Sequence, residues 1–260
     1  NVCSLIGHNT IRRQVMGGSF LRPPTEAELT QMKGYVDQAM KDGAVGLATG
    51  LIYLPGTFAK TEELIELAKV AGAQGGLYAS HMRNEGGSIF TALDELFRIA
   101  REAGTRGHIS HIKLSGKAHW GQADKVIAAI ERARSEGLDI TQDQYAYTAS
   151  STGLSQLVPE TAREGGAEKF RERIHDPAQK SLIVSRMKDS LSKQGREDYG
   201  YAVIASYSKD KSLNGLNVVE ATQRKRGTAS LDDQVELLLE IELNGGASAV
   251  FHNMNEADLR

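Results

Sequence analysis

Two histidines stand at matching points in two strand-like segments of the sequence. The strings YASH and HISH end at His81 and His111, which are one strand-and-helix unit apart. In a parallel barrel, the carboxyl ends of neighbouring strands meet at one rim, where the sites of barrel enzymes lie. Two neutral imidazoles there suit a cation such as Zn²⁺, but two ordinary histidines fit the spacing equally well. His108 precedes His111 by an odd offset, which turns it to the other strand face and predicts a structural role.

Polar residues that follow these strands are candidates for contacting a substrate. Lys113 lies two residues past His111 and would share its strand face, where an ammonium could bind the carboxylate of an anionic substrate. Asp143, Tyr145 and Tyr147 alternate at the end of the next strand, and a phenol there could donate to a developing oxyanion. A solvated lysine and amphipathic residues that close the rim are the alternative interpretations.

Other candidates have weaker support from the sequence. Arg83 and Glu85 could orient metal ligands, but an exposed ion pair of little energetic value is the favoured interpretation. Cys3 lies in an apolar strand and is predicted to be a small buried hydrophobic residue rather than a metal ligand. His8 and Arg12 follow the first strand and could face the same rim.

Short β-rich runs alternate with stretches of helical period, which predicts an α/β fold with a parallel sheet. The predicted strands cover residues 2–6, 44–49, 77–81, 107–112 and 138–145, and the predicted helices cover 25–41, 61–73, 88–103 and 123–135. Strand starts recur about every 31 residues, close to the size of one βαβ unit. This regularity favours a closed (β/α) barrel over an open doubly wound sheet, although spacing alone allows both.

The regular alternation stops after residue 149. We therefore divide the chain into barrel units over 1–149, a polar lid-like insertion over 150–212 and a remaining barrel segment over 213–260. The last two segments contain predicted helices at 167–174, 178–192 and 231–243 and predicted strands at 201–206 and 247–252. The sequence contains no GxGxxG or GxxxxGK[ST] string, so a nucleotide-phosphate cradle is not expected.

Composition narrows the class of partner. The 260 residues carry 31 Lys and Arg against 33 Asp and Glu, a net charge of −2, and show no long basic stripe. We expect a small-molecule partner, and neither a nucleic acid nor a membrane. The single Cys3 excludes a disulfide within the chain, and we predict a cytoplasmic location. The absence of an initiator Met and the helix-like NEADLR at the end predict an internal part of a longer protein.

Several long strings resemble one known family. The strings are GHNTIR, GAVGLATGLIYLPGTFA, YASHMRNEG, ISHIKLSG, DQYAYTA and FHNMNEADLR, which occur in this order along the chain. They closely resemble the N-acyl-D-amino-acid deacylase (D-aminoacylase) family of the amidohydrolase superfamily. The resemblance covers nearly the whole chain and is weakest over residues 150–212.

The resemblance implies a TIM-like (β/α)8 barrel of the metal-dependent hydrolase type, incomplete at both ends of this chain and with a polar insertion. It implies that His81 and His111 bind zinc and that Lys113 and Tyr145 hold the carboxylate or carbonyl region of the substrate. The implied reaction is hydrolysis of the amide of an N-acyl-D-amino acid to a carboxylate and a free D-amino acid. Another amidohydrolase activity, dihydroorotase-like or hydantoinase-like, and a non-catalytic ligand-binding relative are the alternatives.

The family also uses a Cys ligand, a His-x-His pair and a catalytic Asp in a Ser-Asp-Gly string, and this sequence contains none of the three. Cys3 does not stand in the family's Gly-Asn-Cys-Gly context and is not assigned the ligand role. The general-base Asp is expected beyond Arg260. The isolated chain is therefore predicted to be inactive.

Overall fold

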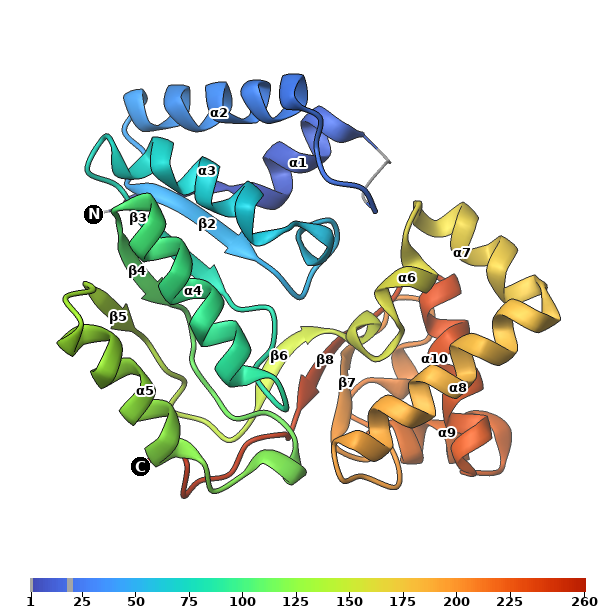
Figure 1. The fold of residues 1–260 in the computed structure, drawn as a ribbon. Coiled ribbons are helices and arrows are strands. Elements are labelled where there is room, and N and C mark those ends of the chain that lie inside the picture. The colour runs from blue at the N-terminus through green and yellow to red at the C-terminus, as the bar shows by residue number, and fades with distance from the viewer. Residues whose placement is uncertain (1, 18–20) are drawn as a thin grey trace. The chain divides into compact units, whose positions relative to one another are not determined.

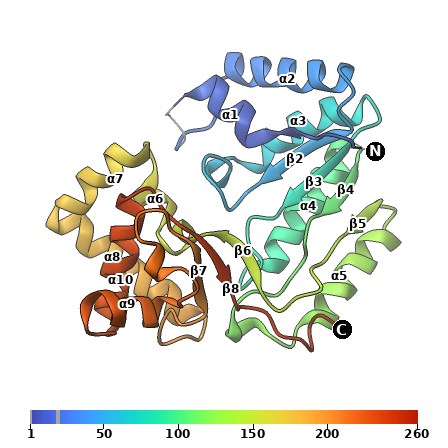
Figure 2. The same cartoon turned by 180° about the vertical axis from the view of Figure 1, so that it is seen from behind.

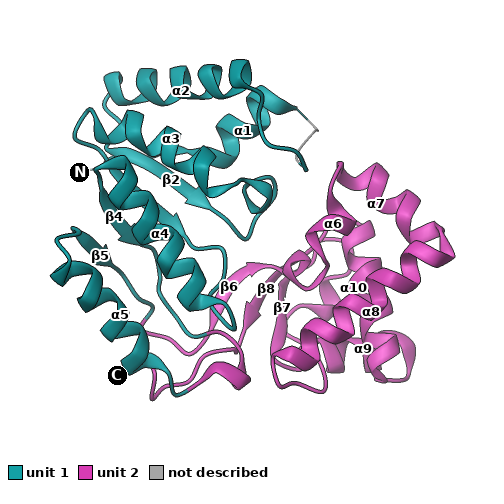
Figure 3. Cartoon of the chain, in the orientation of Figure 1, with its two compact units in different colours: residues 1–114, 121–145 teal, residues 115–120, 146–260 magenta. Residues whose placement is uncertain are grey.

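The computed structural model describes residues 2–17 and 21–260, which fall into two compact units (Figure 3). The described residues up to 114, together with 121–145, form the first unit, and residues 115–120 with 146–260 form the second. The first unit contains β1 (Ile6–Gly7), α1 (His8–Met16), α2 (Glu26–Lys41), β2 (Gly46–Gly50), η1 (Gly56–Phe58), α3 (Thr61–Gly72), β3 (Leu77–His81), α4 (Ile89–Ala103), β4 (Arg106–Ile109), α5 (Ala123–Ser135) and β5 (Ile140–Gln142).

The five strands of the first unit form one parallel sheet in the order β1-β2-β3-β4-β5. Figure 1 labels β2 to β5 of this sheet. Helix α3 packs on β2 and β3, α4 on β4 and α5 on β5, and the helices also pack on one another. Because crossovers between parallel strands are right-handed, a strand order without reversal places the connecting helices on one face. The α/β class with a parallel sheet is confirmed, and a closed eight-stranded barrel is not present among the described residues.

Local sequence signals account for the helices. Thr25 caps α2 and forms a capping box with Glu28, as the spacing of the two residues predicts. Helix α3 buries Leu64, Leu67 and Ala68 on one face, which is the helical spacing of apolar residues. Burying one such leucine stabilises the fold by about 1.5–3 kcal/mol.

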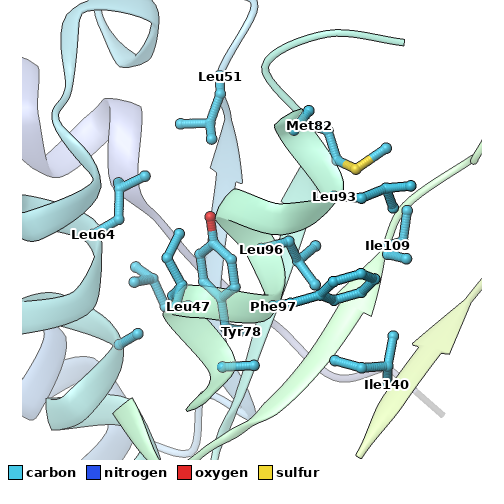
Figure 4. Packing of buried hydrophobic residues seen from close by; sticks show 14 of the residues in the cluster. Leu47, Leu51, Leu64, Tyr78, Met82, Leu93, Leu96, Phe97, Ile109 and Ile140 are labelled. Carbon is cyan, nitrogen blue, oxygen red and sulfur yellow. The ribbon is translucent and has the colours of Figure 1, made fainter. Parts of the chain in front are cut away.

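The core of the first unit lies between the sheet and its helices (Figure 4). Leu47 of β2 and Tyr78 of β3 pack there with Leu64 and Leu96 from the helices, and all four side chains are fully buried. The Tyr78 hydroxyl lies 3.0 Å from Thr49 Oγ1, so this buried polar group has a hydrogen-bond partner. Burial raises the pKa of Tyr78 to about 12.

The second unit combines helices with a small antiparallel sheet (Figure 2). Its elements are η2 (Lys117–His119), β6 (Ser150–Gly153), η3 (Leu154–Leu157), α6 (Glu160–Arg163), α7 (Gly166–His175), α8 (Pro177–Lys193), β7 (Ala202–Ser206), η4 (Lys211–Leu213), α9 (Val218–Arg226), α10 (Leu231–Leu243) and β8 (Ser248–Phe251). The sheet has the order β6-β8-β7, and Ile204, Leu238 and Phe251 belong to the core beside it.

This arrangement differs from the division expected from the sequence. β8 was expected to be a barrel strand, but it pairs antiparallel with β6 and β7, so 150–212 and 213–260 share one unit. Alternation predicts that a strand exists but does not specify the partner of that strand. In the described part of the chain, no helix is both long and apolar enough to cross a membrane.

Candidate metal centre

The two histidines singled out by the sequence lie side by side at the carboxyl end of the parallel sheet. His81 is the last residue of β3, and His111 follows β4 by two residues. Their ring centroids are 4.3 Å apart and the rings meet edge to face, at 75°. The pairing of Ser80 with Ile109 in the neighbouring strands brings them together. The structure therefore places the two imidazoles together at one rim, as the sequence predicted.

His111 occupies a strained backbone conformation. Its φ of 42° is in the left-handed region, which costs a non-glycine residue about 1–3 kcal/mol. Asp143 supports this turn twice, because its Oδ1 accepts the His111 N–H at 2.5 Å and its backbone oxygen accepts the Ile112 N–H at 2.9 Å. The predicted strand over 107–112 accordingly ends at Ile109, where the turn begins.

Lys113 reaches the histidines by a route that the sequence did not indicate. Strand parity predicted a shared face with His111, and this reasoning was wrong because β4 ends before both residues. The Lys113 ammonium instead bends back, donates to His111 O at 2.6 Å and lies 2.8 Å from His111 Nδ1. Its side chain is 2% exposed, so it is not a solvated loop lysine.

Glu85 is the partner that compensates the charge of this buried lysine. Its Oε1 accepts from Lys113 Nζ at 2.5 Å and lies 3.1 Å from His111 Nδ1. Burial acts to raise the pKa of Glu85, but the His111 hydrogen bond and the Lys113 charge outweigh it, so the pKa is lowered. For Lys113, burial outweighs the Glu85 charge and lowers the pKa.

The sequence favoured an exposed ion pair between Arg83 and Glu85, and this prediction is wrong. Arg83 donates instead to both carboxylate oxygens of Glu95, at 2.9 and 3.0 Å, and to the backbone oxygens of Thr57 and Ala59. The two side chains diverge because each has a separate buried partner, and a two-residue spacing carries no information about such partners.

The donors at this site suit a metal ion. His81 Nε2 is buried and has no hydrogen-bond partner among the residues that the structure describes, which is unusual for a buried polar atom. Burial lowers the pKa of His81 to about 4, so the ring is neutral at neutral pH, the form that binds metals. His81, Glu85 and His111 each offer one ligand atom within 4.8 Å of the other two. Nitrogen and oxygen donors of this kind fit zinc.

Two tyrosines extend the cluster on either side. The Tyr145 ring lies 5.5 Å from the His111 ring, and Lys113 Nζ lies 5.1 Å from its centroid. Burial raises the pKa of Tyr145. The Tyr53 ring lies 4.9 Å from the His81 ring. Sequence reasoning missed Tyr53, and its position just after the carboxyl end of β2 was the signal available.

The residues that were expected to alternate with Tyr145 do not join the cluster in the same way. The strand ends at Gln142, so parity fails beyond it. Asp143 Oδ2 accepts from His108 Nε2 at 2.8 Å, in line with the structural role predicted for His108. Tyr147 lies in the second unit, and 74% of its surface is exposed.

The two candidates that follow the first strand are buried away from solvent. Glu63 Oε1 accepts from His8 Nε2 at 2.8 Å and from Arg12 Nε at 3.1 Å. Neither His8 nor Arg12 has any exposed surface, so neither side chain is open to a substrate in this structure. Cys3 is exposed, which corrects its assignment as a buried hydrophobic residue.

Comparison with known proteins identifies similar chains. No family model matches the sequence. The D-aminoacylase of Alcaligenes xylosoxydans xylosoxydans is 40% identical over 156 residues, which is 60% of this chain and 32% of that protein. The N-acyl-D-glutamate deacylase of the same organism is 40% identical over 162 residues, 62% of this chain and 32% of that protein. The matched region is thus about a third of the length of these curated relatives.

Solved structures extend the similarity to the whole chain. A D-aminoacylase crystal structure superposes with a TM-score of 0.74 at 31% identity, covering 100% of this chain and 45% of that one. The N-acyl-D-glutamate deacylase of Bordetella bronchiseptica, complexed with zinc and a phosphonate inhibitor, gives 0.75 at 26% identity with the same coverage. The resemblance seen in the sequence strings is thereby confirmed, and this chain is a homologue of the D-aminoacylases and N-acyl-D-glutamate deacylases over the region that it spans.

Proposed function

We propose that this chain is part of a zinc-dependent amidohydrolase that hydrolyses N-acyl-D-amino acids to a carboxylate and a free D-amino acid. The observation that carries the proposal is the pair of adjacent imidazoles beside a buried ammonium, with one imidazole nitrogen that is buried and unpartnered within residues 2–17 and 21–260. The homologues named for this reaction support it. The five parallel strands are, in this proposal, part of a TIM-like (β/α)8 barrel.

His81 and His111 would hold the zinc ion. A zinc ion held there would polarise an amide carbonyl and lower the pKa of the water molecule bound to it. The neutral His81 ring provides a lone pair without first losing a proton. Lys113 would bind the carboxylate of the substrate, and Tyr145 would contact the same carboxylate or the scissile carbonyl. Fixing one end of the substrate in this way orients the amide toward the reacting groups. Such orientation lowers the activation barrier, whereas binding the substrate and the transition state equally tightly would leave kcat unchanged.

The remaining parts of the reaction belong to the whole protein. The Asp that the resemblance implies as general base would deprotonate water and later protonate the leaving amine. No Ser-Asp-Gly string occurs in this sequence. A small-molecule partner and a cytoplasmic location, without nucleic acid or membrane, complete the proposal.

The test uses the intact protein and a panel of matched substrates. N-acyl-D-amino acids, their L enantiomers and cyclic ureides are compared at equal concentration, with zinc present and after treatment with a chelator. We expect turnover of the D substrates that is lost with the chelator and restored by zinc. Turnover of cyclic ureides alone would contradict the proposal and favour a hydantoinase-like reaction.

A further inference from the structure

The Lys113 ammonium has three polar neighbours at short distance among the described residues. An ammonium carries three protons. Lys113 Nζ lies 2.5 Å from Glu85 Oε1, 2.6 Å from His111 O and 2.8 Å from His111 Nδ1. Two of these three neighbours belong to His111, and the third is the only carboxylate among them. The direction in which the ammonium is held therefore depends on Glu85.

One oxygen of Glu85 contacts both functional side chains. Oε1 accepts from Lys113 and lies 3.1 Å from His111 Nδ1. The side chains of Lys113 and Glu85 are 2% and 11% exposed, so water does little to screen the pair. Removing one member of a buried pair leaves the other charge uncompensated, so the lysine would move to find a new partner.

We propose that Glu85 is a positioning residue that holds the Lys113 ammonium and the His111 imidazole in one fixed arrangement. The inference rests on the proposed function, in which the imidazole binds the metal and the ammonium binds the substrate carboxylate. Glu85 then fixes the separation between these two recognition points. The separation in turn selects substrates whose carboxylate lies at the matching distance from the scissile amide.

The same carboxylate could instead be a metal ligand, since Glu85 is within reach of both histidines. The contact with Lys113 favours the positioning role. Glu85 Oε1 already accepts from the ammonium at 2.5 Å and lies 3.1 Å from His111 Nδ1, so both lone pairs of this oxygen have neighbours within the described residues. A carboxylate that contacts the other ring nitrogen of a metal-binding histidine is one of the common ways in which proteins orient this ligand.

The chain offers a closely matched control in Glu95. Its side chain is also 11% exposed and also pairs with a cation, Arg83, but that cation is neither of the proposed functional groups. The Glu85→Gln and Glu95→Gln variants of the intact protein therefore each remove one partly buried carboxylate charge. Only the first alters the partner of Lys113. Thermal unfolding of both variants measures any general loss of stability.

Steady-state kinetics with an N-acyl-D-amino acid test the link to Lys113. We expect Glu85→Gln to raise KM by between about 10- and 100-fold with a smaller change in kcat, because the ammonium is displaced by about 1 Å or more. Glu95→Gln should leave KM unchanged. At saturating zinc, where the effect through His111 on zinc affinity is removed, the double variant Glu85→Gln/Lys113→Ala should have the KM of Lys113→Ala alone, since Glu85 then acts on KM through the lysine. Multiplying effects, or an unchanged KM in Glu85→Gln, would overturn the proposal.

Zinc binding provides a readout that does not depend on turnover. Competition with a chromophoric chelator should show zinc binding at wild-type stoichiometry in Glu85→Gln, with a Kd raised about 10- to 100-fold. Complete loss of zinc at saturating concentration would make Glu85 a ligand and overturn the positioning role. If the wild-type protein hydrolyses no N-acyl-D-amino acid, the proposed function fails while this measurement still decides the role of Glu85 at His111. Should Glu85→Gln fail to fold, Glu85→Asp, which keeps the charge but shortens the reach, should change Kd and KM in the same directions.

Discussion

The imidazole rings of His81 and His111 meet edge to face with centroids 4.3 Å apart, although the residues are separated by a whole helix and its loops. Parallel pairing of β3 with β4 produces this contact, because it aligns the carboxyl ends of consecutive strands. The contact also depends on a left-handed turn at His111 that Asp143 supports. Sheet pairing and one local turn together account for the position of the candidate metal site.

Loss of either imidazole should abolish zinc binding. In the intact protein, we expect His81→Asn and His111→Asn to retain less than stoichiometric zinc after dialysis and to lose activity by about 1,000-fold or more, because metal catalysis contributes several kcal/mol. His175→Asn is the control, since this exposed ring contacts the backbone oxygen of Arg171 instead. Elemental analysis provides the measurement, and full zinc occupancy in either variant would refute the ligand assignment.

Lys113→Ala should weaken substrate binding more than the chemical step. A hydrogen bond to a charged group contributes about 1.5–3 kcal/mol, so KM should rise about 10- to 100-fold. An unchanged KM for N-acyl amino acids would remove the assigned role. Lys117→Ala, at an exposed position of η2, serves as the control and should behave as the wild type.

Asp143→Ala should destabilise the turn that carries His111. The variant removes the acceptor of the His111 N–H and leaves the strained backbone without this support. We expect a loss of about 1–3 kcal/mol in the free energy of unfolding and weaker zinc binding. Urea denaturation in the presence of a chelator measures the first effect without a contribution from the metal. Wild-type stability would show that the turn does not need Asp143.

Glu63→Ala tests the buried network behind the first strand. The substitution leaves the buried Arg12 without its carboxylate partner, which costs about 3–5 kcal/mol. The neighbouring Glu62→Ala removes the same chemical group from a side chain that is 66% exposed, and surface pairs of this kind contribute about 0–1 kcal/mol. Denaturant unfolding of the two variants should therefore differ clearly, and equal losses would contradict the buried role.

The ionised Glu66 carboxylate should stabilise the fold at neutral pH, and this contribution should be lost in acid. Hydrogen bonds from Lys33 and Lys69 lower the pKa of Glu66 from 4.5 to about 2 in the folded protein. A lowered folded-state pKa stabilises the fold above the unfolded value, and this contribution is lost as the pH falls from about 4.5 to about 2. Glu66→Gln should show a shallower fall in unfolding free energy over this range than the wild type. Solvent screening reduces the size of this contribution. Parallel curves of unfolding free energy against pH for the two proteins would be evidence against it.

Local structure could be predicted from the sequence wherever the signal is short-range. The strand Leu77–His81 and the helices Ala123–Ser135 and Leu231–Leu243 form at the predicted residues, and the capping box at Thr25 is present. Helical period and capping depend on residues three or four apart, which any single sequence displays. The family strings likewise pointed to the homologues and to the two histidines.

Only the tertiary structure decided which distant groups meet. The approach of Lys113 to His111, the recruitment of Glu85 and the packing of Tyr53 on His81 depend on a turn and on buried charge compensation, which have no period along the chain. The pairing of β8 with β6 and β7 was missed for a related reason. An apolar run in the sequence predicts that a strand will be buried. Which strand it pairs with depends on the free energy of packing the whole unit.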